Sequence, residues 1–147
     1  MKISSPTFQN NSAIPKKYTC DDENTNPPLE ISEVPVKAQS LVLIVDDPDA
    51  PGGTWVHWII WDIDPKTTRI EENSVPIKAV EGTTSFGRTG YGGPCPPSGT
   101  HRYFFKLYAL DTKLNLPVMA SASELLRVMA NHILAEAELV GLYSRAK

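Results

Sequence analysis

The chain has 147 residues and a net charge of −3, with 41% apolar and 21% charged residues. This length is close to the commonest size of a single domain. We therefore expect one domain over residues 1–147, with a core large enough to fold without a disulfide or a metal. Lysine and arginine form no cluster, which argues against nucleic acid as the main partner.

The N-terminal residues MKISSPTFQNN lack the apolar core of a secretory signal. The longest aliphatic runs are far too short to span a bilayer, so we expect no integral membrane segment and a cytoplasmic location. Two cysteines, Cys20 and Cys95, are too few for a disulfide framework. We expect both to be free thiols in a reducing cytosol, with a long-range bridge as the less favoured alternative.

Short apolar segments, rich in β-branched and aromatic side chains and separated by turn residues, predict a mainly β protein. They cover residues 3–8, 29–34, 40–45, 54–63, 75–80 and 101–110. Their spacing favours an antiparallel sandwich or barrel, and no linker or internal repeat divides the chain. Segment 54–63 is apolar on both faces, which places it at the centre of a sheet with packing on each side.

The connection GTTSFGRTGYGGPCPPSGT, residues 82–100, holds six glycines and three prolines. Loops this long without regular structure are uncommon in compact domains and are often functional. Glycine permits a close approach of the backbone to a ligand, and proline limits the freedom of the loop. A purely structural Ω-loop is the alternative.

One helix is expected near the C-terminus. Ser121 and Glu124 form a capping box, and a helical spacing relates Leu125, Met129, His132, Ile133 and Glu136. Gly141 lies where a helix stop is expected, and the residues after it could add a last strand. His132 lies on the apolar side of this helix, where we expect a hydrogen-bonded packing histidine rather than a ligand-binding one.

The stretch DDPDAPGG, residues 46–53, places three carboxylates between two apolar segments. His57 follows just inside the second of these segments, and strand periodicity puts His101 and Tyr103 on one face where the Gly/Pro loop joins. If these strands lie side by side, imidazoles, a phenol and carboxylates converge on one cleft. Imidazoles, a phenolic hydroxyl and glycine N–H groups are suitable donors to a phosphate or carboxylate.

An acidic residue in such a site has two explanations. Asp47 or Asp49 either orients a histidine and keeps it charged, or receives the ammonium of a zwitterionic ligand such as phosphoethanolamine. A calcium loop starting at Asp47 is excluded, because Trp58 stands at position 12, where a bidentate glutamate is required. A metal site built from the aspartates and histidines of the cleft lacks any recognised ligand spacing, so we expect no metal.

Nucleophilic catalysis would need Ser85, Ser98 or Cys95 beside a histidine, and no nucleophile elbow surrounds any of them. The Gly-rich loop contains no GK[ST] and does not open a helix with GxGxxG, so nucleotide hydrolysis has no support. We therefore expect no cofactor and no enzymatic activity.

The motif DPDAP, the aromatic-rich strand with its central histidine, and the segment SFGRTGYGGPCPPSGTHRYFFKLYALD closely resemble the phosphatidylethanolamine-binding protein family. This family is also called the Raf kinase inhibitor protein family, and the match is to its bacterial and archaeal branch. The resemblance implies a β-sandwich of a large central sheet and a smaller sheet, a C-terminal helix and a small anion pocket.

Transferred by position, the resemblance gives a set of pocket residues: Asp47, Pro51, His57, Pro97, His101 and Tyr103. Further contacts from the Gly/Pro loop are expected at Ser85, Arg88, Gly92 and Gly93. The resemblance also implies a cis peptide bond between Ala50 and Pro51.

Two departures limit the transfer. Thr84 stands where many relatives have asparagine, and the chain ends at Lys147 without the C-terminal extension of mammalian relatives. Kinase regulation is therefore not transferred. Family members include serine-protease inhibitors and homodimers, neither of which has a signature here.

The main hypothesis is a non-enzymatic binding protein for phosphate or phosphoethanolamine-like groups, which a phosphorylated partner could also present. A protein-interaction module that inhibits a protease or kinase is the first alternative. A hydrolase that uses the His/Asp cluster is the second.

Overall fold

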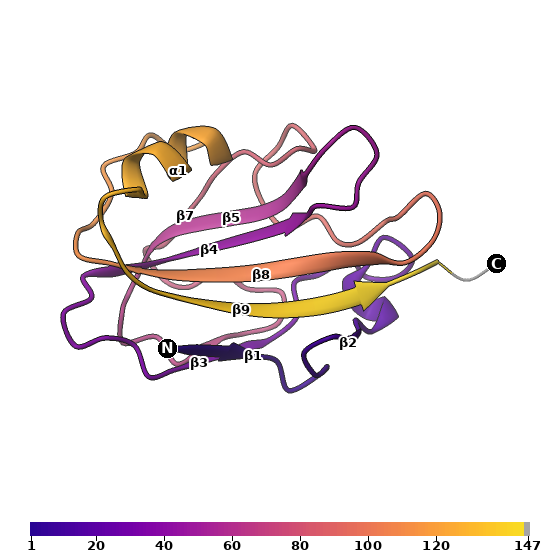
Figure 1. Ribbon diagram of the computed structural model, residues 1–147, viewed down its shortest axis with the longest axis horizontal. Helices are drawn as coiled ribbons and strands as arrows, with labels where there is room; N and C mark the ends of the chain where they lie inside the picture. The colour runs from indigo at the N-terminus through magenta and orange to yellow at the C-terminus, as the bar shows by residue number, and fades with distance from the viewer. Residues whose placement is uncertain (146–147) are drawn as a thin grey trace.

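The computed structural model describes residues 1–145 and consists of a six-stranded and a three-stranded sheet (Figure 1). The small sheet has the antiparallel order β1 (Lys2–Ser4), β3 (Leu29–Ser32), β6 (Arg69–Ile70). The large sheet has the order β2 (Ser12–Ala13), β9 (Ile133–Tyr143), β8 (His101–Leu110), β4 (Ser40–Asp47), β5 (Trp55–Ile63), β7 (Val80–Glu81). A 3₁₀-helix, η1, covers Lys16–Tyr18, and the helix α1 covers Ala122–Met129. The expected two-sheet fold with a helix near the C-terminus is confirmed.

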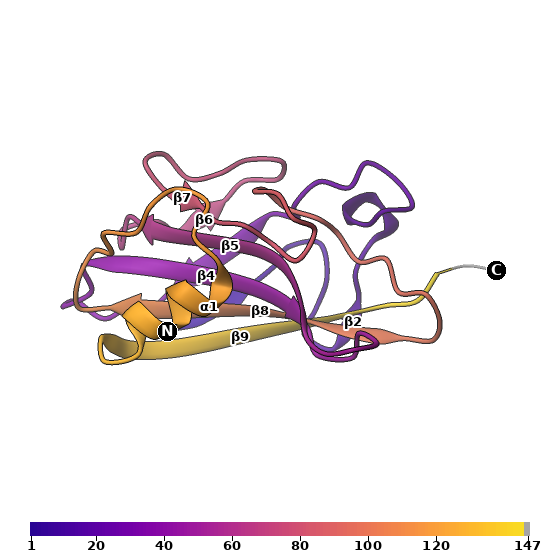
Figure 2. The same ribbon diagram turned by 90° about the horizontal axis from the view of Figure 1, so that it is seen from above.

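Strand β4 lies between β5 and β8 and is buried along its whole length. Alternate side chains of a strand point to opposite faces, so an apolar strand such as β4 needs packing on both sides. Leu41, Leu43 and Val45 face the small sheet, while Val42 and Ile44 face α1. Figure 2 shows α1 lying against the large sheet.

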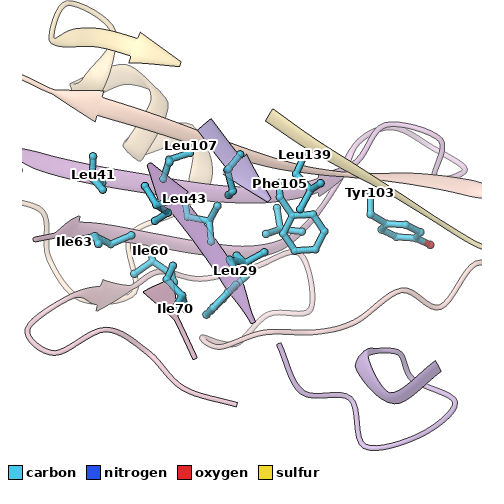
Figure 3. Packing of buried hydrophobic residues seen from close by; sticks show 14 of the residues in the cluster. Leu29, Leu41, Leu43, Ile60, Ile63, Ile70, Tyr103, Phe105, Leu107 and Leu139 are labelled. Carbon is cyan, nitrogen blue, oxygen red and sulfur yellow. The ribbon is translucent and has the colours of Figure 1, made fainter. Parts of the chain in front are cut away.

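The core between the two sheets is a continuous row of aliphatic and aromatic side chains (Figure 3). Leu29 and Ile70 from the small sheet meet Leu43, Ile60 and other residues of the large sheet. Each fully buried aliphatic side chain of this kind contributes about 1.5–3 kcal/mol relative to exposure. At one end of the row Tyr103 points its hydroxyl away from the aliphatic side chains (Figure 3).

The C-terminal helix is shorter than predicted. Its capping box is present, with Ser121 Oγ accepting from the Glu124 N–H at 3.2 Å, but α1 ends at Met129. Residues Ile133–Tyr143 form β9, which pairs antiparallel with the whole length of β8. The helical spacing read across residues 129–136 is therefore wrong, because residues 135–139 (AEAEL) alternate between apolar and charged side chains and pair with β8 as a strand.

His132 follows α1 rather than lying within it. It is only partly buried, and its Nδ1 lies 2.7 Å from Asp111 Oδ1. The prediction of a hydrogen bond is confirmed, whereas the helical position is wrong.

Two other expected strands differ from the structure. The segment 3–8 is a strand only at its start, in β1, and the segment 75–80 contributes only its last residue, to β7. Residues 75–79 instead include a turn, which places Pro76 and its neighbours at the surface. Within residues 1–145, no helix is long and apolar enough to cross a membrane.

Candidate ligand-binding site

The end of β4 and the starts of β5 and β8 meet at one end of the large sheet, because β5 and β8 are both antiparallel to β4. In Figure 1 this is the end toward which β9 runs to the C-terminus, since His101 pairs with Tyr143. A cavity of about 240 Å³ opens there. Its lining contains all six residues expected from the resemblance, together with others: Asp47, Ala50, Pro51, Trp55, His57, Phe86, Cys95, Pro96, Pro97, His101 and Tyr103.

Asp47 and His101 form a buried pair, with His101 Nδ1 2.7 Å from Asp47 Oδ2. An ionised carboxylate only accepts hydrogen bonds, so Nδ1 carries the hydrogen and the ring presents Nε2 as its second polar atom. The other carboxylate oxygen of Asp47 accepts the Asp49 N–H at 2.8 Å. Asp47 therefore orients the imidazole of His101.

His57 is held in the same way by a backbone group. Its Nδ1 lies 2.6 Å from the carbonyl oxygen of Gly92, so Nδ1 is the donor and Nε2 remains. Burial lowers the pKa of His57, although the Gly92 carbonyl and the charge of Asp47 oppose that shift. At neutral pH the ring is therefore mainly uncharged, and Nε2 is a hydrogen-bond acceptor that can still take up a proton.

Tyr103 packs edge-on against His57, with ring centroids 5.2 Å apart. Its hydroxyl is buried and has no hydrogen-bond partner among the described residues. Burial raises the pKa of Tyr103, and the charges of Asp47 and Asp49 act in the same direction. The phenol therefore keeps its proton, and an unpaired buried donor of this kind costs about 1–3 kcal/mol until a ligand or water accepts from it.

Asp49 lies outside the cavity, in contrast to the expected cluster. Its carboxylate makes a two-point ion pair with Arg102, at 2.9 Å to Nε and 2.8 Å to an Nη atom, and also accepts the Arg102 N–H. Arg102 lowers the pKa of Asp49 to about 2. Asp49 thus ties the DPDAPGG turn to the start of β8, and only Asp47 faces the cavity.

The Gly/Pro loop packs against the protein itself. A Cβ on Gly92 would lie 2.3 Å from the Phe86 ring, and one on Gly93 would lie 2.4 Å from the Tyr18 carbonyl oxygen. Close backbone approach is therefore needed at these glycines, but toward side chains and backbone of the same chain. Thr84 also stabilises the loop, because its Oγ1 donates to the Arg88 carbonyl and accepts from the Phe86 N–H.

The four expected loop contacts do not line the cavity. Ser85 Oγ accepts the Val56 N–H at 2.8 Å, and the Arg88 guanidinium lies 5.6 Å from the centre of the Phe86 ring. Gly92 acts indirectly by fixing His57, and the Gly93 N–H donates to Asn24 Oδ1 at 2.7 Å.

The expectation of two free thiols is wrong, because Cys20 and Cys95 form a disulfide with Cα atoms 5.5 Å apart. The segment after η1 lies beside the Gly/Pro loop, and the Cys20 N–H donates to the Pro94 carbonyl at 3.1 Å. The cysteines are 75 residues apart, so only this tertiary contact brings them together. Disulfides persist mainly in oxidising compartments or in hyperthermophiles, so cysteine usage does not support a reducing compartment.

The expected cis bond before Pro51 is also absent, since no peptide bond among the described residues is cis. Asp47 is directed inward without it. The residue is the last of β4, where pairing with Trp55 on one side and the bond to His101 on the other fix its position.

Sequence reasoning missed the aromatic rim of the cavity. Trp55 and Phe86 pack edge-to-face, with ring centroids 5.5 Å apart, and both are partly exposed at the opening. Trp55 could have been found, because it lies two residues before His57 on the same face of β5. Phe86 could not, because its position depends on the path of the loop.

Among residues 1–145, no group of three or more histidine, cysteine, aspartate or glutamate side chains is arranged to hold a metal ion. The polar side chains of the cavity are instead Asp47, His57, His101 and Tyr103, enclosed by proline and aromatic side chains. The cavity thus lies at one end of a two-sheet β-sandwich.

The comparisons identify the family. Residues 4–144 match the family model described as phosphatidylethanolamine-binding protein, and the chain belongs to this family. A UPF0098 protein of Methanothermobacter thermautotrophicus is 50% identical over 99% of both chains. UPF0098 protein PH1269 of Pyrococcus horikoshii is 51% identical over 99% of this chain and 77% of its own length.

Two solved structures share the fold. A phosphatidylethanolamine-binding protein homologue of Chlamydia trachomatis is 41% identical and superimposes with a TM-score of 0.95, over 99% of this chain and 97% of its own. YbcL of E. coli, described as a member of the mammalian family, is 30% identical with a TM-score of 0.92, over 99% and 98%. The bacterial and archaeal branch expected from the motifs is therefore confirmed.

Proposed function

We propose that this protein is a non-enzymatic receptor for small anionic groups, with phosphate and phosphoethanolamine-like groups as its ligands. One observation carries the proposal. Two buried imidazoles, His57 and His101, each have Nδ1 bound to an acceptor inside the protein, which leaves both Nε2 atoms and the unpaired Tyr103 hydroxyl as polar groups of one small cavity.

Protonation of the imidazoles makes this site suited to an anion. Once Nε2 of each ring takes up a proton, the cavity offers imidazolium donors and a phenol, and charge-assisted hydrogen bonds of this kind contribute about 1.5–3 kcal/mol each. Because burial lowers the pKa of His57, the anion and a proton bind together. Affinity should therefore rise as the pH falls from about 8 to about 6.

The dimensions of the cavity favour a head group over a whole lipid. Its volume of about 240 Å³ lies below the range of about 300–1,000 Å³ that is usual for drug-sized ligands. A phosphoryl group with a small substituent fits this volume, and the aromatic rim of Trp55 and Phe86 would contact whatever carries the group. A phosphorylated partner could therefore present its phosphate to the same cavity.

The alternatives have less support. Catalysis by Cys95 is disfavoured because its sulfur is in the disulfide, and Ser85 uses its oxygen to accept from Val56. Ammonium recognition by Asp47 is disfavoured because both carboxylate oxygens already accept hydrogen bonds. Inhibition of a protease or kinase and a cytoplasmic location stay predictions.

Calorimetric titration of phosphate, phosphoethanolamine and sulfate at pH 6 and pH 8 tests the proposal. Sulfate does not titrate in this range, so tighter sulfate binding at pH 6 reports protonation of the protein. In the variant His57→Asn/His101→Asn, the asparagine amide can make the hydrogen bond that Nδ1 makes in the wild type, but it supplies no group in the place of Nε2. We expect this variant to bind each anion at least about tenfold more weakly.

His132→Asn is the matched control, because this third histidine is also bonded to an acceptor through Nδ1 but lies outside the cavity. It should bind anions like the wild type. Equal affinity of the wild type and the double variant, or tighter sulfate binding at pH 8, would contradict the proposal.

A further inference from the structure

The end of the sandwich opposite the cavity carries a short repeat. Residues 34–38 read VPVKA and residues 75–79 read VPIKA. Each forms a turn closed by the same hydrogen bond, from the alanine N–H to the proline carbonyl, at 3.0 Å from Ala38 and 3.1 Å from Ala79. The two turns come from different connections, before β4 and before β7, and are called here the two VPxKA turns.

Both turns place an aliphatic side chain and a lysine at the tip. Val36 is 102% exposed and Ile77 is 86% exposed, whereas the alanine that closes each turn packs against the core between the sheets. A side chain as exposed as it is in an extended peptide gains nothing from folding. Val36 and Ile77 therefore contribute nothing to the stability of the fold and are free to contact a partner.

The backbone of the second turn supports this view. Lys78 adopts a φ of +67° at the third position of its turn, where glycine or asparagine is the usual residue. Glycine would reach this conformation without strain. The lysine side chain is held at the tip in spite of that cost.

The VPxKA turns share one end of the molecule. Ile77 and Lys78 line a shallow depression together with Gln39, which follows the first turn, and with Lys66 and Lys113. In the described part of the chain, four exposed lysines at this end make no ion pair: Lys37, Lys66, Lys78 and Lys113.

Nearby acidic groups cancel this charge only in part. Asp62 and Asp64 line the same depression and accept the backbone N–H groups of Leu114 and Lys66. Arg69 is offset by Glu30 and Glu71. With Arg69 and its two glutamates included, these five basic and four acidic side chains leave a net charge of +1 at this end, although the chain as a whole has a net charge of −3.

From these observations we propose that the two VPxKA turns dock the protein on an anionic lipid bilayer. Two isolated aliphatic tips next to lysines match the interface of a membrane, where the aliphatic group enters the acyl boundary and the ammonium lies among lipid phosphates. Paired tips on separate loops need no complementary pocket in a bilayer, whereas a folded protein partner would have to supply two. The positive surplus selects anionic over neutral lipid.

Docking of this kind directs the ligand cavity away from the bilayer. Strand β8 runs from His101 at the cavity to Leu110 at the lysine end. Its ten residues at about 3.3 Å each separate the two ends by about 30 Å. The cavity of the docked protein would then sample soluble ligands rather than head groups of the same membrane, and the docking does not depend on what the cavity binds.

Co-sedimentation with vesicles tests the proposal. Vesicles of phosphatidylcholine alone are compared with vesicles that also contain about one third phosphatidylglycerol, at low and high salt. We expect the wild type to sediment with the anionic vesicles only, and to be released as salt shortens the screening length from about 10 Å to about 3 Å.

The variant Lys37→Glu/Lys78→Glu should partition at least about tenfold more weakly, because each lysine near an anionic surface strengthens binding about fivefold. The variant Val36→Ser/Ile77→Ser should also weaken binding to the anionic vesicles at low salt, although it leaves every lysine in place. Since all four side chains are exposed, both variants should keep the melting temperature of the wild type.

Leu126→Ser/Arg127→Glu is the matched control. Leu126 is 48% exposed on α1 and Arg127 makes no ion pair among residues 1–145, so this variant makes the same chemical changes outside the turns. It should bind vesicles like the wild type.

Three results would overturn the proposal: equal sedimentation with neutral and anionic vesicles, unchanged binding of the tip variants, or an equal loss in the control variant. A concentration-dependent dimer that is lost in Val36→Ser/Ile77→Ser would assign the turns to a second copy of the chain instead.

Discussion

Removal of the disulfide should destabilise the protein strongly while leaving it folded. The bridge between Cys20 and Cys95 closes a loop of 75 residues. In the chain-entropy description, such a loop lowers the entropy of the unfolded chain by about 15 cal/mol/K, which corresponds to about 4.5 kcal/mol at 25 °C. Measured losses for native disulfides are typically about 2–5 kcal/mol, so we expect a value in that range.

The native state keeps other contacts at this place. The Cys20 N–H donates to Pro94, and the Gly93 N–H donates to Asn24, independently of the sulfur atoms. The strands that form the cavity are joined through β4 rather than through the bridge. The variant Cys20→Ala/Cys95→Ala should therefore fold at 25 °C, with its loss of stability arising mainly in the unfolded state.

Urea unfolding followed by fluorescence measures the difference, because Trp58 and Trp61 are both buried in the native state. Wild type treated with a reductant should show the same free energy of unfolding as the alanine variant. A loss of less than about 1 kcal/mol in both samples would refute the reasoning, since it would mean that the bridge does not restrict the unfolded chain.

Three further predictions concern other parts of the structure. Asp49→Asn should lower the free energy of unfolding by about 1 kcal/mol at pH 7, because the pair with Arg102 is largely exposed. The pKa of Asp49 is lowered to about 2, so this difference between the variant and the wild type should disappear in acid unfolding curves as the pH falls from about 4 to about 2. Leu125→Ala should lower the free energy of unfolding by about 2–5 kcal/mol, because this side chain is fully buried under α1. Leu126→Ala, on the exposed side of α1, should lower it by less than about 1 kcal/mol. Equal losses of stability in urea unfolding would show that α1 packs on a different face. His57 should titrate below its usual pKa of 6.5 when followed by NMR, and addition of phosphate should raise that pKa; a pKa above 6.5 in the free protein would contradict burial as the dominant cause.

The lowered pKa of His57 also has a consequence for stability. The unfolded chain binds a proton at this residue at a higher pH than the folded chain does. Stability therefore falls as the pH drops below about 6.5, and it rises again when an anion binds together with the proton. A stability profile measured with and without phosphate between pH 5 and pH 8 should show the two curves diverging at low pH.

Much of the architecture could be read from local pattern. Segment 54–63, apolar on both faces, is the buried strand β5, and the capping box at Ser121 begins α1. The alternation of His101 and Tyr103 placed both side chains on one face, and both line the cavity. These features depend on side-chain order within one element, so a single sequence contains the information.

Other predictions failed where two local patterns competed or where a partner was distant. Ile133 and Glu136 fit a helical spacing, whereas residues 135–139 fit an alternating one, and only the presence of β8 alongside selects the strand. The residues alone did not separate Asp47 from Asp49, yet Asp47 binds His101 and Asp49 binds Arg102. Each choice depends on strand register, which follows from packing across the whole sheet.

The sequence by itself determined the elements that carry their own signal: the two-faced strand, the capping box, the Gly/Pro loop and the residue types of the site. Tertiary structure alone decided that Cys20 meets Cys95, that Phe86 closes the cavity beside Trp55, and that the two VPxKA turns lie at one end. The physical reason is that strand pairing brings together residues far apart in the chain. Such contacts are selected by the combined burial of all strands, which no short stretch of sequence contains.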